Sequence, residues 1–214
     1  MADRVAEPRR MLAVCTANVC RSPVAEAILA RRLADVVDID GRRWTVSSAG
    51  TDRYPGLVEP DTVAAAAARG LDITMHTSRQ VSQADLDEAD LVLAMTRSHV
   101  RSLVATDPAA WPRTFTLKEL VRRSIDVLPS KVGGFADWLA SAGAGRRAAD
   151  MLRPSDDDDV VDPYRRGRAA NVEMVNEIER LVDDLLIWGP WTAGESARLE
   201  RLARCDSDST IGPG

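Results

Sequence analysis

A cysteine and an arginine with five residues between them are the first groups in this sequence that could do chemistry. Cys15 follows a short apolar run at 11–14, and Arg21 precedes the dipeptide Ser22-Pro23. The apolar run predicts a buried strand, and Ser followed by Pro predicts the capped start of a helix. The intervening loop would therefore lie where an open α/β sheet binds ligands, at the end of a strand. The loop residues are Thr16, Ala17, Asn18, Val19 and Cys20.

A loop in this position is suited to binding phosphate. Its backbone N–H groups can converge on one dianion, and the helix dipole adds to the attraction. The same field would lower the pKa of the Cys15 thiol from about 8.5 into the range of about 3.5–7.5 seen in activated cysteines. Arg21 could hold two phosphate oxygens with its planar guanidinium. We expect residues 16–20 and Ser22 to surround the substrate, although the motif in this strand–loop–helix setting is equally compatible with a structural cysteine and a surface arginine.

Predicted strands and helices alternate along the rest of the chain. Apolar runs predict further strands at 44–48, 90–95 and 113–117. Periodicity and alanine content predict helices at 61–69, 97–104 and 171–187, in addition to the one after Ser22-Pro23. The alternation predicts an α/β fold in three layers, a four-stranded parallel sheet with helices on both faces.

The predicted elements divide the chain into one domain and its extensions. We expect a disordered tail at 1–9, a catalytic domain at 10–188 and a C-terminal extension at 189–214, with an amphipathic helix near 194–204. Within the domain, residues 122–159 form an unusually long insertion, with a helix expected around 135–152 and an acidic run at 156–159. Connections of this length are usually lids or disordered, and we expect a lid that tunes substrate access.

The composition excludes several functions. The net charge of −5 and the lack of a basic run with interleaved aromatics argue against a nucleic-acid partner. No apolar run suits a membrane span or a signal peptide. Cysteines at 15, 20 and 205 are too few for a disulfide scaffold and suit a reducing cytoplasm. The two histidines, His76 and His99, have no neighbouring thiol, so we expect no metal and no cofactor. Arginine outnumbers lysine 26 to 2, which we interpret as origin in a GC-rich bacterial genome.

A longer match connects the loop to a known family. Residues 14–26, VCTANVCRSPVAE, closely resemble the signature of the low-molecular-weight protein tyrosine phosphatases. The resemblance spans residues 10–188 with a gap over the insertion, and it implies the family's three-layer fold and the hydrolysis of phosphotyrosine. Further segments follow in the family's order: SAGT at 48–51, GLDI at 70–73, HTSRQ at 76–80, DLVLAM at 90–95 and DPY at 162–164.

The resemblance also implies roles for individual residues. Cys15 would attack phosphorus and form a cysteinyl-phosphate, while Arg21 holds the transferred group. Asp162 would protonate the leaving phenolate and then activate the hydrolytic water. A second Asp-Pro pair occurs at Asp107, but the tyrosine that follows and the position ahead of the last helix favour Asp162. Ser22 would hydrogen-bond the Cys15 thiolate, cap the helix, or do both.

Five other residues match supporting positions of the family. Asn18, Ser48 and His76 match residues that brace the phosphate loop. Tyr54 and Tyr164 match aromatics that flank the mouth of the site and would sandwich a phenyl ring, which suits phosphotyrosine over the shorter phosphoserine.

Cys20 lies in the same loop as Cys15 and admits two interpretations. It could trap an oxidised Cys15 as a disulfide, or it could simply fill space.

Ala17 and Val19 bear on activity and on the choice of substrate. Ala17 stands where glycine is usual, so it would strain the loop if that residue needs a positive φ. Val19 stands where related protein arginine phosphatases tend to carry threonine, and an apolar residue there favours a phenyl ring.

Other functions on the same scaffold remain alternatives. An arsenate reductase would need downstream cysteines, for which Cys205 is the only candidate. A non-catalytic phosphate-binding module would have no use for Asp162. We expect a monomer that acts on tyrosine-phosphorylated protein substrates, with no nucleic-acid or membrane partner.

Overall fold

The computed structural model describes residues 7–128, 131–153 and 155–191. These residues form a four-stranded sheet in the order β2-β1-β3-β4, and each neighbouring pair of strands is parallel. Cys15 lies beside Gly50 and Val14 beside Ala94, so the carboxyl ends of these strands meet at one edge of the sheet. The predicted parallel sheet is therefore confirmed. Its strands are β1 (Arg9–Cys15), β2 (Trp44–Gly50), β3 (Leu91–Ala94) and β4 (Thr114–Thr116).

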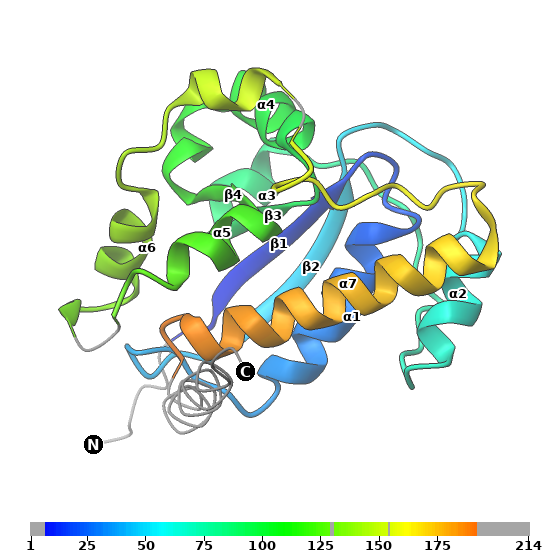
Figure 1. Ribbon diagram of the computed structural model, residues 1–214, viewed down its shortest axis with the longest axis horizontal. Helices are drawn as coiled ribbons and strands as arrows, with labels where there is room; N and C mark the ends of the chain where they lie inside the picture. The colour runs from blue at the N-terminus through cyan, green and yellow to red at the C-terminus, as the bar shows by residue number, and fades with distance from the viewer. Residues whose placement is uncertain (1–6, 129–130, 154, 192–214) are drawn as a thin grey trace, which may run out of the picture.

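Helices cover both faces of this sheet and complete the three predicted layers (Figure 1). The larger core lies between the sheet and one set of helices, and a smaller core lies on the opposite face, under α3 and α4. The first set is α1 (Arg21–Leu33), α2 (Pro60–Ala67), α5 (Leu117–Ser124), α6 (Phe135–Gly143) and α7 (Gly167–Trp188). The second set is α3 (Gln83–Glu88) and α4 (Arg97–Thr106), and the 3-10 helices are η1 (Pro108–Arg113) and η3 (Ala148–Leu152).

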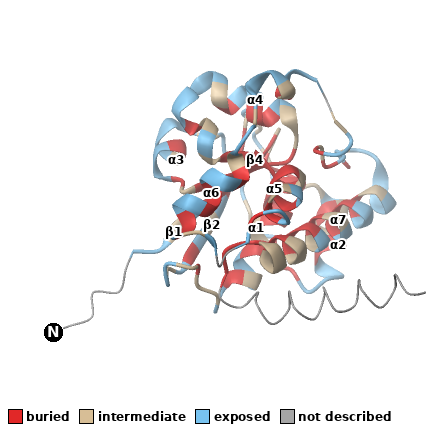
Figure 2. Cartoon of the chain, turned by 60° about the vertical axis from the view of Figure 1, so that its left-hand side comes forward, coloured by how far each residue is buried: buried red, intermediate tan, exposed pale blue. Residues whose placement is uncertain are grey.

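Residue alternation along β1 explains why its apolar run is continuous. Met11 and Ala13 belong to the larger core, whereas Leu12 and Val14 belong to the smaller one. Successive side chains of a strand point to opposite faces, so a strand covered on both sides must be apolar throughout. Figure 2 shows the result: buried residues follow the strands and the inner sides of the helices.

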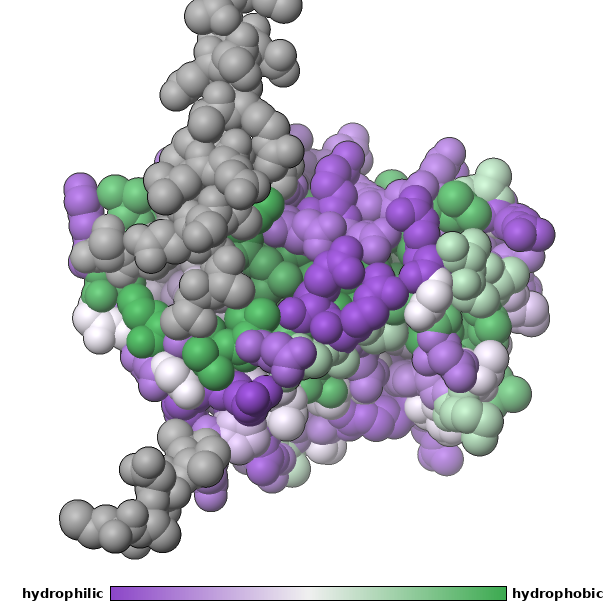
Figure 3. All heavy atoms as spheres, turned by 90° about the horizontal axis from the view of Figure 1, so that it is seen from below, coloured by the Kyte–Doolittle hydropathy of each residue, from purple (hydrophilic) through white to green (hydrophobic). Residues whose placement is uncertain are grey.

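The outer surface of α1 and α7 is charged. Arg32 on α1 is paired with Glu179 and Asp183 on α7. Hydrophilic side chains gather on this face of the molecule, which Figure 3 views from below. Among the described helices, none is long and apolar enough to cross a membrane.

β1 begins two residues before the predicted strand, at Arg9. The guanidinium of Arg9 forms ion pairs with Asp38, Asp40 and Asp90 and lies over the ring of Phe135, 4.5 Å from its centroid. Arg9 is therefore anchored in the sheet and is not part of the polar tail that the sequence predicted at 1–9.

The single helix expected around 135–152 is divided into α6 and η3. α6 ends at Gly143, because Ala144 leaves the helical conformation with a ψ of 132°, and Gly145 in the turn that follows has a φ of +74°, which favours glycine. Trp138 of α6 is fully buried in the larger core, and Met151 of η3 packs against β3 and α4. Both described pieces of this segment therefore contribute to the folded core.

The folded part of the chain continues past the predicted boundary at residue 188. Trp191 is buried, donates from Nε1 to the carbonyl oxygen of Leu185 at 2.9 Å, and packs edge-on against Trp44. The amphipathic helix expected at 194–204 lies outside the described residues.

Candidate active site

The carboxyl end of β1 and the start of α1 border a cavity of 270 Å³. The loop between them runs close to the backbone of β2, where a Cβ atom on Gly50 would lie 2.5 Å from the carbonyl oxygen of Thr16. Glycine is therefore required at this approach. The cavity is lined by Cys15, Thr16, Ala17, Val19, Cys20, Arg21, Asp52, Arg53, Tyr54, Asp162 and Tyr164.

Cys15 is buried, and its thiol lies against the hydroxyl group of Ser22. The distance from Cys15 Sγ to Ser22 Oγ is 3.0 Å, and the carbonyl oxygen of Ala49 lies 3.3 Å from the same hydroxyl. Ser22 has one hydroxyl proton, so it can donate to either acceptor. A thiolate at Cys15 would be the stronger acceptor because it carries a charge. The predicted contact between Ser22 and Cys15 is confirmed.

Ser22 does not cap the helix, contrary to one of the two roles expected of it. α1 begins one residue earlier, at Arg21, and its N-cap residue Cys20 makes no side-chain capping bond. The hydroxyl of Ser22 instead contacts Cys15, Ala49 and Asn18. Its hydrogen-bonding capacity is therefore directed into the phosphate loop.

Asn18 is fully buried and holds the loop from within. Its Nδ2 donates to Ser22 Oγ at 3.0 Å and to Ser48 Oγ at 2.8 Å. Its Oδ1 accepts from the backbone N–H of Arg79 and from His76 Nε2, both at 3.1 Å. All four hydrogen-bonding positions of the amide are used. The predicted association of Asn18, Ser48 and His76 is confirmed by these contacts.

An acidic residue that the sequence argument did not single out completes this network. Glu26 accepts a hydrogen bond from Ser48 Oγ at 2.6 Å, and its carboxylate lies 3.8 Å from His76 Nδ1. Burial lowers the pKa of His76, an effect that the charge of Glu26 partly opposes. A neutral His76 that donates from Nε2 to Asn18 fits both observations.

The left-handed residue of the loop is Asn18 and not Ala17. Asn18 has a φ of 55°, and Arg165 is the other described non-glycine residue with a positive φ. Asparagine tolerates this conformation better than most residues. The strain expected from alanine at position 17 is therefore absent, because the loop does not require a positive φ there.

Arg21 joins the loop to the segment that carries Asp162. Its Nη2 donates to Asp162 Oδ2 at 2.6 Å and lies 3.4 Å from Thr16 Oγ1, while its Nη1 donates to the carbonyl oxygen of Val160. The side chain of Arg21 is 5% exposed and that of Asp162 is 48% exposed. The Nε of Arg21 is buried and has no partner among the described residues, so one donor of the fork remains free.

His99 contacts the loop from the opposite side, and sequence reasoning missed it. Its Nε2 lies 2.9 Å from Thr16 Oγ1, and its Nδ1 lies 2.9 Å from Thr96 Oγ1. Burial and the nearby charge of Arg21 lower the pKa of His99 to about 3. A signal existed in the sequence, since His99 lies in the first turn of the helix that follows the strand next to β1.

The two tyrosines meet at the rim of the cavity, as expected. Their hydroxyl oxygens are 3.3 Å apart, and the rings of Tyr54 and Tyr164 pack edge-to-face with centroids 6.4 Å apart. The hydrogen bond to Tyr164 raises the pKa of Tyr54. Asp52 and Arg53, which precede Tyr54, also line the cavity and had not been predicted.

Cys20 is a buried free thiol in the same loop. Burial raises the pKa of Cys20 to about 12, although a hydrogen bond with Thr62 acts in the opposite direction. Because thiolates and not thiols attack sulfur, trapping of an oxidised Cys15 by Cys20 would be slow at neutral pH. The redox role considered for Cys20 stays a hypothesis.

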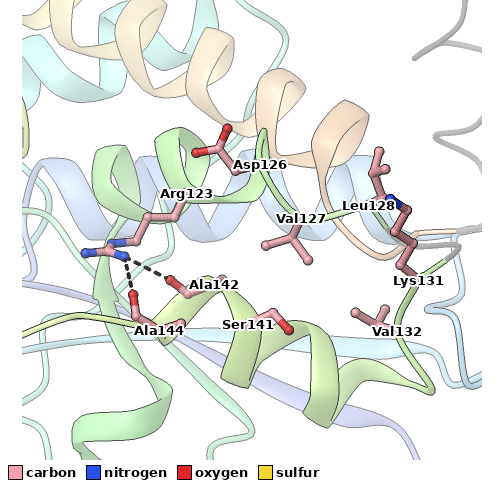
Figure 4. Close-up of a pocket in the computed structure, with 9 residues that line it drawn as sticks. All are labelled: Arg123, Asp126, Val127, Leu128, Lys131, Val132, Ser141, Ala142 and Ala144. Atoms are coloured by element: carbon pink, nitrogen blue, oxygen red, sulfur yellow. Dashed lines mark hydrogen bonds between the residues drawn. The ribbon is translucent and has the colours of Figure 1, made fainter.

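Another hollow, of 420 Å³, lies between the end of α5 and α6 (Figure 4). Its Arg123 already donates to the carbonyl oxygens of Ala142 and Ala144. Its lining contains no cysteine or histidine, so it offers no comparable nucleophile. The lining residues are Arg123, Asp126, Val127, Leu128, Lys131, Val132, Ser141, Ala142 and Ala144.

Two further expectations bear on the site. Within the described ranges, no group of three or more histidine, cysteine, aspartate or glutamate side chains could hold a metal ion. None of the described residues that line the 270 Å³ cavity comes from 122–159, so the lid expected there stays a prediction from the sequence.

This chain is similar to several known proteins. The family model "Low molecular weight phosphotyrosine protein phosphatase" matches residues 10–129. A low molecular weight protein-tyrosine-phosphatase of Streptomyces coelicolor is 31% identical over 179 residues, which are 83% of this chain and 91% of the relative. A protein-arginine-phosphatase of Bacillus subtilis is 34% identical over 125 residues, which are 58% of this chain and 80% of the relative.

A solved structure is similar to this chain in both fold and sequence. The low molecular weight protein tyrosine phosphatase from T. tengcongensis superposes with a TM-score of 0.61 at 30% identity, covering 83% of this chain and 97% of the other. With the family model matching more than half of the residues, this chain belongs to the low molecular weight phosphotyrosine protein phosphatase family.

Proposed function

We propose that this protein hydrolyses phosphotyrosine in protein substrates through a cysteinyl-phosphate intermediate. The observation that carries the proposal is the meeting of Cys15, Arg21 and Asp162 in one cavity whose rim is formed by Tyr54 and Tyr164. A nucleophile, a cation and an acid are the groups that phosphoryl transfer from an aryl ester requires.

In the first step the Cys15 thiolate attacks phosphorus. The S–P bond forms as the P–O bond to the aryl group breaks, and Asp162 gives its proton to the departing phenolate oxygen. Ser22 Oγ stabilises the thiolate before attack through the 3.0 Å contact. The free Nε of Arg21 and its Nη2 offer a planar fork to two phosphate oxygens.

In the second step water hydrolyses the cysteinyl-phosphate. Asp162, now a carboxylate, accepts a proton from the attacking water, the S–P bond breaks and the Cys15 thiolate is restored. Because Arg21 Nη2 donates to Asp162 at 2.6 Å, a bound phosphate would compete with Asp162 for this donor. That competition would free Asp162 to face the leaving oxygen.

The cavity favours an aromatic phosphoester. Val19 is buried and lines the cavity, and the paired rings of Tyr54 and Tyr164 border its mouth. The apolar wall at Val19 suits a phenyl ring better than a charged guanidinium, because it offers no partner for the charge. Hydrolysis of phosphoarginine is the second candidate, because a protein-arginine-phosphatase is among the relatives.

We assign the phosphatase domain to residues 9–191, from the first residue of β1 to the buried Trp191, and its action to a reducing compartment such as the cytoplasm. The nucleophile must remain a free thiol, and Cys15 and Cys20 are both free. A reducing compartment preserves that state.

Steady-state hydrolysis of phosphotyrosine and phosphoarginine peptides tests the function. We expect turnover confined to phosphotyrosine, abolished in Cys15→Ser and reduced about 10²–10⁴-fold in Asp162→Ala. Turnover confined to phosphoarginine would replace the proposed substrate, and turnover unaffected by Cys15→Ser would overturn the mechanism.

A further inference from the structure

The acidic run at 156–159 is not a uniformly solvated face. Asp156 and Asp157 are exposed, whereas the side chain of Asp158 is only 1% exposed. Asp158 lies between two arginines: Arg97 Nε donates to its Oδ2 at 2.6 Å, and Arg122 Nη1 donates to its Oδ1 at 2.7 Å. A buried carboxylate needs such partners, because desolvation disfavours its charge.

The residues after Asp158 lead directly to the active site. Asp159 Oδ1 accepts from the backbone N–H of Arg97 at 2.7 Å, at the first residue of α4. Val160 is buried, its N–H donates to the carbonyl oxygen of Met95 at 2.8 Å, and its own carbonyl oxygen accepts from Arg21. The chain from Asp158 to Val160 is thus fixed to the end of β3, to α4 and to Arg21.

Asp162 itself has little packing of its own. Its side chain is 48% exposed, and the preceding Val161 is 58% exposed. Besides Arg21, its contact among the described residues is the backbone N–H of Tyr164, which donates to its Oδ1 at 3.1 Å. The position of Asp162 therefore depends on how firmly the chain before it is anchored.

We propose that Asp158, clamped by Arg97 and Arg122, is a positioning residue for the general acid Asp162. The inference rests on the proposed phosphatase function and deepens it. Asp158 and Asp159 act by fixing the approach to Asp162 and not by covering the cavity. A substitution far from the chemistry can cost on the order of 10²-fold in rate if it misplaces a catalytic group by about 1 Å. An anchor four residues before Asp162 can therefore affect catalysis.

The test is a comparison of kcat/KM for two aryl phosphates. Phenyl phosphate releases a basic phenolate that needs protonation, whereas nitrophenyl phosphate releases a much weaker base. Losses caused by a misplaced acid are therefore larger with phenyl phosphate. A general loss of structure would reduce both rates by the same factor.

Asp158→Asn is the primary variant, and Asp157→Asn is its matched control, with the same charge change on an exposed neighbour. For Asp158→Asn we expect about a tenfold loss with phenyl phosphate and about twofold with nitrophenyl phosphate. Asp157→Asn should leave both rates unchanged. Equal losses with both substrates, or no loss in Asp158→Asn, would overturn the inference.

Arg122→Gln keeps the test decisive if Asp158→Asn does not fold. The side chain of Arg122 is 51% exposed, and its loss leaves Asp158 paired with Arg97. A smaller loss that is again greater for phenyl phosphate supports the inference, and equal or absent losses overturn it. Wild type and Asp162→Ala are assayed with the same two substrates. An inactive wild type, or an Asp162→Ala variant with unchanged rates, would contradict the proposed function itself and not only the role of Asp158.

Discussion

The phosphate loop and the 122–159 segment are held to the same sheet by different kinds of interaction. The direct contacts of Asn18 are uncharged: its amide bonds to the hydroxyls of Ser22 and Ser48, and the carboxylate of Glu26 contacts this network only through Ser48 and near His76. In 122–159 the braces are buried ions. The side chains of Arg146 and Glu119 are each 2% exposed and lie 2.8 Å apart.

The difference follows from what each region must do. Uncharged donors and acceptors can fix the loop without competing with the field that attracts a phosphate dianion. The 122–159 segment has no such constraint, and its arginines also cover aromatic rings: the guanidinium carbon of Arg146 lies 3.8 Å from the ring centroid of Phe115. We therefore expect damage to the loop to affect mainly activity, and damage to the Arg146–Glu119 pair, neither member of which lines the 270 Å³ cavity, to affect mainly stability.

The largest expected effect is the loss of the Arg146 brace. Arg146→Ala leaves Glu119 buried with only the partly exposed Arg123 as an ion-pair partner, and it removes donors to the carbonyl oxygens of Trp111 and Thr114. Breaking a buried pair in this way costs about 3–5 kcal/mol. Urea unfolding should show this loss, while kcat/KM of the remaining folded protein should be unchanged.

The neighbouring Arg147 supplies the control for this prediction. Its side chain is 78% exposed and pairs with Asp150 at the surface. Arg147→Ala should leave the free energy of unfolding nearly unchanged. Equal effects of the two variants would contradict the distinction between buried and surface ions.

The next largest effect concerns Asn18, and here activity should fall. Asn18→Ala removes four hydrogen bonds and places alanine at a φ of 55°. We expect roughly 2–3 kcal/mol of lost stability from the unpaired groups and the strained backbone. A loosened loop should also lower kcat/KM by about 10–100-fold.

Asn18→Gly separates the two contributions, because glycine accepts the left-handed backbone without strain. It should recover about 1 kcal/mol of stability relative to the alanine variant but none of the activity. Recovery of activity with glycine would mean that backbone conformation and not the amide network orders the loop.

The smallest expected effect is a pH dependence carried by His99. The pKa of His99 is about 3 in the folded protein, against 6.5 for an ordinary histidine such as that of the unfolded chain. As the pH falls, the unfolded chain therefore binds a proton before the folded protein does. The stabilisation by neutral His99 is thus complete above pH 6.5 and is lost on acidification, by about 2 kcal/mol between pH 7 and pH 5. His76 acts in the same direction, because its pKa is also lowered.

His99→Gln removes the titration while keeping polar atoms near Thr16. The difference in unfolding free energy between pH 7 and pH 5, measured in urea, should be smaller in this variant by about 2 kcal/mol. An unchanged pH difference would show that folding does not lower the pKa of His99.

Much of the fold could be predicted because it depends on local patterns. Apolar runs marked the strands, and the alternation with helices marked the parallel sheet. The residues around Cys15 could be proposed because they lie in one continuous segment that resembles a family signature. Asn18, Ser48 and His76 could be grouped only through that resemblance, since nothing local indicates that they meet.

Features that depend on distant partners could not be predicted. His99 reaches Thr16 across 83 positions of sequence, and Arg146 reaches Glu119 across 27. The burial of Asp158 within the acidic run could not be predicted, because its arginine partners lie 61 and 36 positions away. The backbone conformation of the loop could not be predicted either, so the sequence could not say whether Ala17 needs a positive φ; in the structure Asn18 has it.

Direct detection of phosphate on Cys15 tests the central claim. Wild type and Asp162→Ala would be mixed with nitrophenyl phosphate, quenched in acid and digested. The mass of the peptide that contains Cys15 would then be measured by mass spectrometry. We predict an added phosphoryl group on Cys15, more abundant in Asp162→Ala because hydrolysis of the intermediate lacks its base. Release of phosphate with Cys15 unmodified in both proteins would contradict the account.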